Sequence, residues 1–101
     1  MTTQDPETVL KVSAPAELTA ITFTPFREKT RAGILPGHKR LDVDMEGTAF
    51  VDSSGLGALI ALHKAMDSRN GSVRLLNPRQ PVLQILELTR MHRMFEIVRA
   101  A

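Results

Sequence analysis

The chain has 101 residues, 43% of them apolar, a size and composition that suit one folded domain with a single core. It contains no cysteine, which excludes disulfides, thiol chemistry and cysteine-based metal binding. No apolar run is long enough to span a membrane, and the N-terminal residues lack the basic and apolar regions of a signal peptide. We therefore expect a cytoplasmic protein that does not insert into a membrane.

The formal net charge is +2, but its distribution is uneven. Residues 1–67 hold 7 Lys or Arg and 9 Asp or Glu, a net of −2, whereas residues 68–101 hold 6 Arg and 2 Glu, a net of +4. Such an asymmetry can attract nucleic acid or an acidic protein surface. The six arginines are scattered rather than gathered on one helical face, and the chain has no Tyr or Trp for base stacking. We expect no nucleic-acid partner.

The first part of the chain is expected to form a tail, a strand and a helix. Residues 1–8 form a short polar tail, and residues 9–101 a single domain. Residues 9–14 alternate in a way that suits a strand, while residues 15–24 fit either a strand or a turn that enters a helix. Thr24, followed by a proline, is a candidate N-cap for that helix. The Leu-Pro-Gly sequence at 35–37 would end it.

Within residues 39–46, charged and apolar side chains alternate from Arg40 onward. This pattern predicts a strand with one face on a core and the other face in water. The expected inner face consists of Leu41, Val43 and Met45, and the expected outer face of Arg40, Asp42, Asp44 and Glu46.

From Gly55 the apolar period changes from 2 to 3.6, which indicates a helix that ends at 68–71. Residues 72–77 read as a strand and residues 78–91 as a helix whose prolines are confined to its start. Residues 94–98 suit a last strand or a short closing helix. The expected inner stripes are Leu56, Leu59, Ile60, His63 and Met66 on the first helix, and Val82, Ile85, Leu86 and Thr89 on the second. Alternation of strands and helices with short loops predicts an α/β fold with parallel strands.

The stretch Asp52-Ser-Ser-Gly joins a strand to a helix. Its simplest role is helix capping, with Ser53 or Ser54 accepting free amides of the first turn. Serine hydrolysis does not fit, because a nucleophile elbow needs glycines on both sides of the serine and no histidine has an adjacent orienting acid. Nucleotide binding does not fit either, because no phosphate-binding glycine loop is present and Asp52 would repel a phosphate.

Covalent phosphorylation of this serine pair is compatible with the fold. A phosphoserine adds roughly −1.5 to −2 charges beside a helix N-terminus, where the helix dipole tolerates an anion. The modification would make the neighbouring surface much more negative and would repel a partner docked there.

Three stretches together resemble the STAS domain of bacterial anti-sigma factor antagonists. "VLKVSAPAELT" is similar to the family's strand and following turn, "RLDVDMEGTAFVDSSGLGALIALHK" to its central strand, D-S-[ST]-G-L-G junction and helix, and "NGSVRLLNPRQPVLQILELTRMHRMFEIV" to its C-terminal part. The resemblance covers roughly residues 9 to 98. It implies a small, mixed but largely parallel β-sheet with helices packed mainly on one face, in a compact, N-terminally shortened form.

In that family the serine directly after the aspartate is phosphorylated by an anti-sigma factor serine kinase, and a phosphatase reverses the modification. The resemblance therefore implies a phosphoprotein of signal transduction and transcription regulation, a binding module in a partner-switching circuit and not an enzyme, with no cofactor and no metal. By position the phosphorylated residue is Ser53, with Ser54 as second choice. The implied partner-binding residues are Glu17, Thr19, Asp52, Ser53, Ser54, Gly55, Leu56 and Gly57.

Two further expectations remain open. Ala16 and Thr19 depart from the family's G-E-L-D turn, which favours an alternative function: a constitutive STAS scaffold or an accessory subunit of a transporter or stress-signalling complex, without phosphorylation. An exposed sheet edge next to Val9 would also favour a homodimer.

Overall fold

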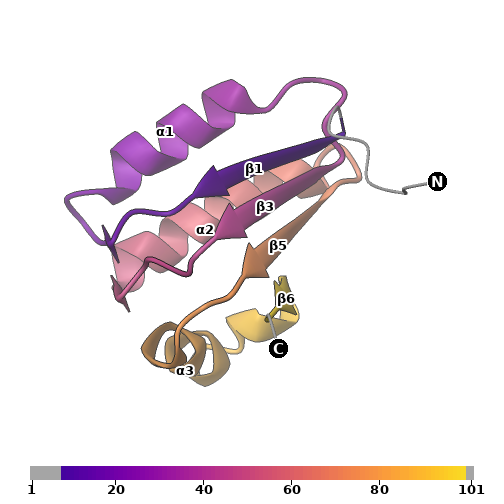
Figure 1. Cartoon of the computed structure of the whole chain (residues 1–101). Coiled ribbons are helices and arrows are strands. Elements are labelled where there is room, and N and C mark those ends of the chain that lie inside the picture. Colours follow the sequence, from indigo (N-terminus) through magenta and orange to yellow (C-terminus); the bar gives the residue numbers. More distant parts are fainter. Residues whose placement is uncertain (1–7, 100–101) are drawn as a thin grey trace.

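A computed structural model describes residues 8–99 of the chain (Figure 1). The strands are β1 (Val9–Ser13), β2 (Glu17–Leu18), β3 (Arg40–Asp44), β4 (Phe50–Val51), β5 (Ser72–Leu76) and β6 (Glu96–Val98). The helices are α1 (Phe23–Gly33), α2 (Ser53–Asp67), α3 (Gln80–Leu88) and a 3₁₀ turn, η1 (Met91–Arg93).

Four strands form a parallel sheet in the order β1-β3-β5-β6, and β2 and β4 form a separate parallel pair. Each parallel pairing in the larger sheet needs a crossover connection, which α1, α2 and α3 supply in turn. The expected α/β class with a parallel sheet is confirmed. Of the two alternatives for residues 94–98, the strand is the one that forms.

The start of the first helix differs from the sequence-based expectation. The N-cap position is Thr22, not Thr24, so the helix begins at Phe23, two residues before the proline. The Thr22 hydroxyl donates to the Glu17 carbonyl at 2.6 Å and accepts from the Thr19 amide at 2.9 Å. These two bonds close the turn after β2. The Thr22 side chain caps no helix amide, but these bonds hold the turn that leads into the helix, and Thr24 is exposed.

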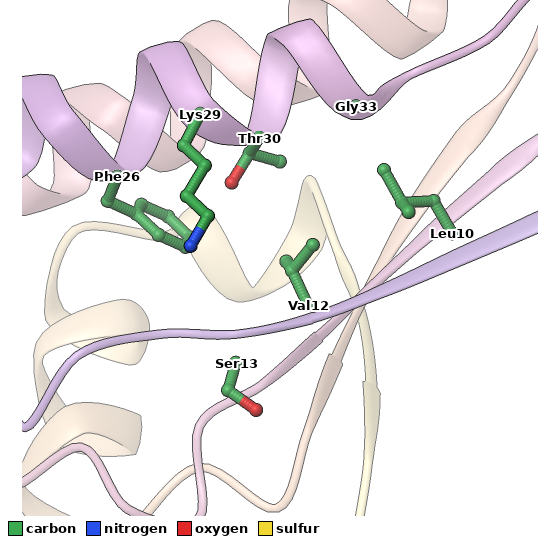
Figure 2. A pocket seen from close by; sticks show the side chains of 7 residues that line it. All are labelled: Leu10, Val12, Ser13, Phe26, Lys29, Thr30 and Gly33. Carbon is green, nitrogen blue, oxygen red and sulfur yellow. The ribbon is translucent and has the colours of Figure 1, made fainter.

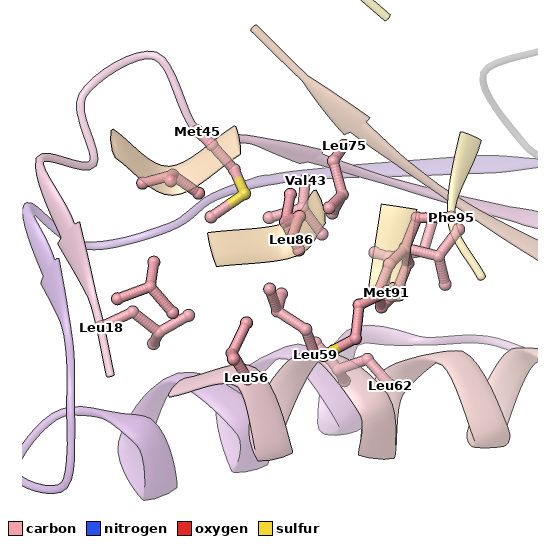
Figure 3. Packing of buried hydrophobic residues seen from close by; sticks show 14 of the residues in the cluster. Leu18, Val43, Met45, Leu56, Leu59, Leu62, Leu75, Leu86, Met91 and Phe95 are labelled. Carbon is pink, nitrogen blue, oxygen red and sulfur yellow. The ribbon is translucent and has the colours of Figure 1, made fainter. Parts of the chain in front are cut away.

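One apolar cluster holds the helices against one face of the sheet (Figure 3). Leu56, Leu59 and Leu62 of α2 point toward the sheet, where Val43 and Leu75 meet them. The cluster also contains Leu18, Leu41, Met45, Val51, Met66, Val73, Val82, Leu86, Met91 and Phe95, with Phe23 and Phe26 of α1 packed on it. In α2, Leu62 and Ala58 are fully buried, whereas Ile60 and His63 are only half-buried, so the inner stripe is rotated slightly from the expected one.

The opposite face of the sheet carries charged side chains rather than helices. In register across the four strands lie Lys11, Asp42, Arg74 and Glu96, which alternate in sign. Asp42 was expected to face water, but it is only 5% exposed, because Arg40 and Arg74 cover it. The expectation for this residue was wrong, since long arginine side chains from the same face shield the shorter aspartate from solvent.

Two of the remaining turns contain a residue with left-handed backbone angles. Asn70 adopts a left-handed conformation, with φ 61°, just after the end of α2, a position where asparagine is common. Arg90 does the same after α3 and directs the chain into η1 and then β6. The predicted tail lies outside the described residues apart from Thr8, whose carbonyl accepts the amides of Lys39 and Arg40.

Candidate functional site

The junction between β4 and α2 is capped by Asp52, not by a serine. Asp52 has extended backbone angles, and one oxygen of its carboxylate accepts the amide of Gly55 at 2.9 Å. The expectation that Ser53 or Ser54 caps this helix was wrong. Aspartate and serine are both good caps, but Asp52 stands one residue before the first helical residue, where a side chain can reach the amides of the first turn.

The second carboxylate oxygen of Asp52 joins the junction to a distant turn. It accepts the amide of Ala20 at 3.1 Å, across 32 residues of sequence. The Asp52 amide in turn donates to the Leu18 carbonyl at 3.1 Å. The turn after β2 and the start of α2 are therefore held side by side, which brings the Glu17–Thr19 segment next to Ser53 and Ser54.

Because Asp52 does the capping, the two serine hydroxyls remain available. Ser53 is the first residue of α2 and is exposed, whereas Ser54 is half-buried. Neither hydroxyl has a hydrogen-bond partner within residues 8–99. An exposed, unengaged hydroxyl at a helix N-terminus is accessible to a modifying enzyme, and an added anion would meet a favourable helix dipole.

The two glycines after the serines have different environments. A Cβ on Gly55 would overlap the carbonyl oxygen of Leu18 and lie 2.9 Å from Cγ1 of Val51. Gly55 therefore allows α2 to approach β2 and β4 closely. Gly57 is exposed, with no atom within 4 Å of where its Cβ would be. Of the sequence-derived site residues, Gly55 and Leu56 lie in the interior and Glu17, Ser53 and Gly57 on the surface.

Two exposed apolar residues beside this junction were missed by sequence reasoning. Ile21 is 87% exposed and follows the amide that Asp52 holds, and Phe50 is 48% exposed and lies opposite Glu17 in the β2–β4 pair. Exposed apolar side chains beside a potential modification site suit protein contact. Neither could be recognised beforehand, because Ile21 fitted an inner strand position and Phe50 an apolar strand run.

The three histidines are used elsewhere. His38 is buried, and its Nδ1 accepts the Leu35 amide at 2.9 Å. His63 contacts Phe95 edge to face, and Nδ1 of His92 lies 3.4 Å from the Leu86 carbonyl. No histidine forms an ion pair with a carboxylate in the described part of the chain. Between residues 8 and 99 no group of His, Asp or Glu is arranged to hold a metal ion.

No helix of the described residues combines the length and the hydrophobicity that crossing a bilayer requires. The molecule thus has the form of a small α/β domain in which a strand–turn–helix junction presents an exposed serine.

Comparison with known families identifies this class of domain. The STAS domain model matches residues 1–100, so the chain belongs to the STAS domain family. No curated protein resembles it closely enough to count as a relative.

Solved structures share the fold at low identity. A putative anti-sigma factor antagonist from Thermotoga maritima, TM1081, has a TM-score of 0.83 and 21% identity over 97% of this chain and 84% of its own. The anti-sigma factor antagonist SpoIIAA in its unphosphorylated form has a TM-score of 0.81 and 19% identity, with the same coverage of both chains. The murine anion transporter Slc26a9 has a TM-score of 0.83 and 22% identity over 97% of this chain but only 17% of its own.

Proposed function

We propose that this protein is an anti-sigma factor antagonist-like regulatory module of a bacterial partner-switching circuit. In this proposal it acts in the cytoplasm, binds a serine kinase when Ser53 is unmodified, and is released when the kinase phosphorylates Ser53. A phosphatase restores the binding form. The protein is then a binding module rather than an enzyme.

The observation that carries the proposal is that Asp52 and Ser53 have different roles at the junction. Asp52 supplies the helix cap and the link to the turn after β2, so the side chain of Ser53 contributes no hydrogen bond to the fold within residues 8–99. A modification at Ser53 would therefore leave the junction intact. Membership of the STAS family supports this reading, as does the fold shared with SpoIIAA, which is known in unphosphorylated and phosphorylated forms.

The partner would bind the surface around the junction. Glu17, Thr19, Asp52, Ser53, Ser54 and Gly57 are proposed contacts because each has exposed or half-exposed surface there. Gly55 and Leu56 would support this surface from below, since both are buried. A phosphate on Ser53 would add roughly −1.5 to −2 charges next to the Asp52 carboxylate, and like-charge repulsion would oppose docking of a partner that accepts the unmodified surface.

The test compares wild-type protein with Ser53→Asp as baits in the native lysate, read by mass spectrometry. We expect wild type to capture a serine kinase and Ser53→Asp to lose it, with both proteins equally folded by circular dichroism. Ser72→Asp, which adds the same charge at an exposed serine at the start of β5, is the matched control and should still capture the kinase. If Ser53→Asp retained the kinase as well as wild type does, the phosphorylation switch would be refuted.

The second candidate function is a constitutive STAS scaffold or a transporter-associated module without phosphorylation. It is favoured by the fold shared with the Slc26a9 anion transporter and by Ala16 and Thr19 in the turn beside the junction. Phosphoprotein analysis of the native cell separates the two candidates. Phosphate on Ser53 supports the switch, whereas a wholly unmodified protein bound to a transporter supports the scaffold.

A further inference from the structure

A cavity of about 420 Å³ lies at the edge of the sheet, between β1 and α1 (Figure 2). It exists because α1 packs mainly on α2 and stands away from β1. Its volume falls within the range of small-molecule sites in proteins. The lining residues are Leu10, Val12, Ser13, Phe26, Lys29, Thr30 and Gly33.

The lining combines an apolar surface with two polar groups that converge from α1. Leu10 and Val12 rise from β1 toward the helix, and the Phe26 ring closes one end. The ammonium group of Lys29 points from α1 into the space beside Phe26, and the hydroxyl of Thr30 points into the same space (Figure 2). The hydroxyl of Ser13, by contrast, points away from α1, so Ser13 borders the cavity without supplying a side-chain contact.

Both polar groups lack a partner in the described part of the chain. Thr30 is only 3% exposed, and its hydroxyl makes no hydrogen bond there. Its oxygen opens onto the cavity, since Nδ1 of His63 is the one fully enclosed polar side-chain atom without a partner among the described residues, so a bound acceptor could reach the Thr30 hydroxyl. Lys29 likewise forms no ion pair with any residue from 8 to 99. A ligand whose anionic group also accepts hydrogen bonds would pair with the Lys29 ammonium group and the Thr30 hydroxyl at once.

We propose that this cavity binds a small monocarboxylate with an apolar tail. The carboxylate accepts hydrogen bonds from Lys29 and Thr30, and the tail lies on Leu10, Val12 and Phe26. A single ammonium group matches a singly charged carboxylate better than a doubly charged phosphate, and the apolar lining leaves no partner for a polar tail. The site is separate from the Ser53 junction, so the proposal does not depend on phosphorylation.

The first test is an NMR titration of the ¹⁵N-labelled protein with octanoate as the probe and octylammonium as the probe of opposite charge. We expect octanoate to bind saturably and to shift the amide signals of Val12, Lys29 and Gly33, and octylammonium to leave them unchanged. Ser53→Asp should bind octanoate as wild type does. Equal binding of both probes, shifts confined to other residues, or no saturable binding would each overturn the proposal.

Charge and space are then tested separately with matched variants. Lys29→Met should weaken octanoate binding about tenfold or more, whereas Arg31→Met, which removes a charge from the same helix outside the cavity, should not. A Cβ on Gly33 would lie 3.6 Å from Cδ2 of Leu10, an ordinary contact, so Gly33→Leu is expected to fold and to fill the cavity. It should abolish binding, while Ala32→Leu on the exposed side of the same turn should not.

Thr30→Val distinguishes a ligand-binding role of the Thr30 hydroxyl from a purely structural role. Valine has the same shape without the hydroxyl, and this hydroxyl bonds no protein group in the described residues, so the variant should melt at about the same temperature as wild type in the absence of ligand. It should also bind octanoate more weakly, because one hydrogen bond to the carboxylate is lost. A variant with lower thermal stability, or with unchanged octanoate affinity, would contradict the role assigned to Thr30.

Discussion

Asp52 uses its two carboxylate oxygens for two different backbone amides, one in its own helix and one in a distant turn. Asparagine keeps one acceptor oxygen but places an NH₂ group against the other amide, where donor meets donor. Asp52→Asn should therefore lower the free energy of unfolding by about 1 kcal/mol, and Asp52→Ala by about 2 kcal/mol, because alanine loses both bonds. Urea denaturation measures both. Equal stability of the asparagine variant and wild type would show that the Ala20 bond contributes nothing.

Asp42 lies between the guanidinium groups of Arg40 and Arg74, on the face of the sheet that carries no helices. Its carboxylate accepts bonds of 2.9 and 3.2 Å from Arg40 and two of 3.1 Å from Arg74. Burial alone would raise the pKa of the Asp42 carboxyl, but the hydrogen bonds from Arg74 and Arg40, with their positive charges, outweigh burial and hold it below its ordinary value of 3.8. Because folding lowers this pKa, the carboxylate stabilises the fold above pH 3.8, and this contribution is lost as the pH falls through the folded value.

Asp42→Asn should be less stable than wild type by about 2 kcal/mol near neutral pH, because two arginines lose their charged partner. The difference should narrow as the pH falls below 3.8 toward the lowered pKa of folded Asp42, because the wild-type carboxylate then becomes protonated as well. Urea denaturation at about pH 7 and about pH 3 measures this change. Asp67→Asn is the control, because Asp67 is exposed and forms no ion pair in the described residues, so its effect should stay small at both values. A difference between Asp42→Asn and wild type that does not depend on pH would disprove the ion-pair account.

At the scale of the elements, the first two turns of α2 contain two glycines with opposite predicted responses to alanine. Gly55→Ala should destabilise the fold by about 1 to 3 kcal/mol, since its Cβ meets the backbone of Leu18 and α2 must move away from β2. Gly57→Ala should stabilise the fold by up to about 1 kcal/mol, since the site is open and alanine favours the helix. The midpoints of urea denaturation measure both changes. Equal shifts in the same direction would show that α2 does not depend on this close approach.

Element types could be predicted from the sequence, because the strands β3 and β5 and the helix α2 each show a clear apolar period. The capping residue could not, because serine and aspartate both suit a helix start and the choice depends on Ala20, which arrives from another element. The burial of Asp42 could not be predicted from the sequence for a similar reason. Alternation shows which face a side chain takes, but not whether an arginine on the neighbouring strand β5 covers it.

For the candidate site, local sequence identified the residues and tertiary structure determined their roles. The D-S-S-G-L-G resemblance led to Ser53, and the fold leaves that serine exposed, but its phosphorylation stays a prediction. Nothing in the sequence indicated that Ile21 and Phe50 would be exposed or that a cavity would lie beneath α1. Each of these features results from how whole elements are placed relative to one another.

At the scale of the whole molecule, the two edges of the larger sheet differ in length. β6 has three residues, whereas β1 has five and pairs only with β3 within residues 8–99. The Ala14 amide donates to the Asp44 carbonyl and the Thr8 carbonyl accepts from β3, so the even-numbered backbone groups of β1 face β3. The Lys11 amide therefore lies on the free edge, where a second copy of the chain could add a strand.

If the homodimer expected from the sequence forms through this edge, Lys11→Pro should prevent it, because proline removes the edge donor while edge strands tolerate its ring. We expect wild type to self-associate with rising concentration in sedimentation velocity, and Lys11→Pro to remain a monomer with an unchanged circular dichroism spectrum. Lys11→Ala keeps the amide and removes a side chain of the kind that discourages edge pairing, so it should associate more strongly than wild type. A dimer that survives Lys11→Pro would place the interface elsewhere. A wild-type protein that stays monomeric at every concentration would refute the homodimer.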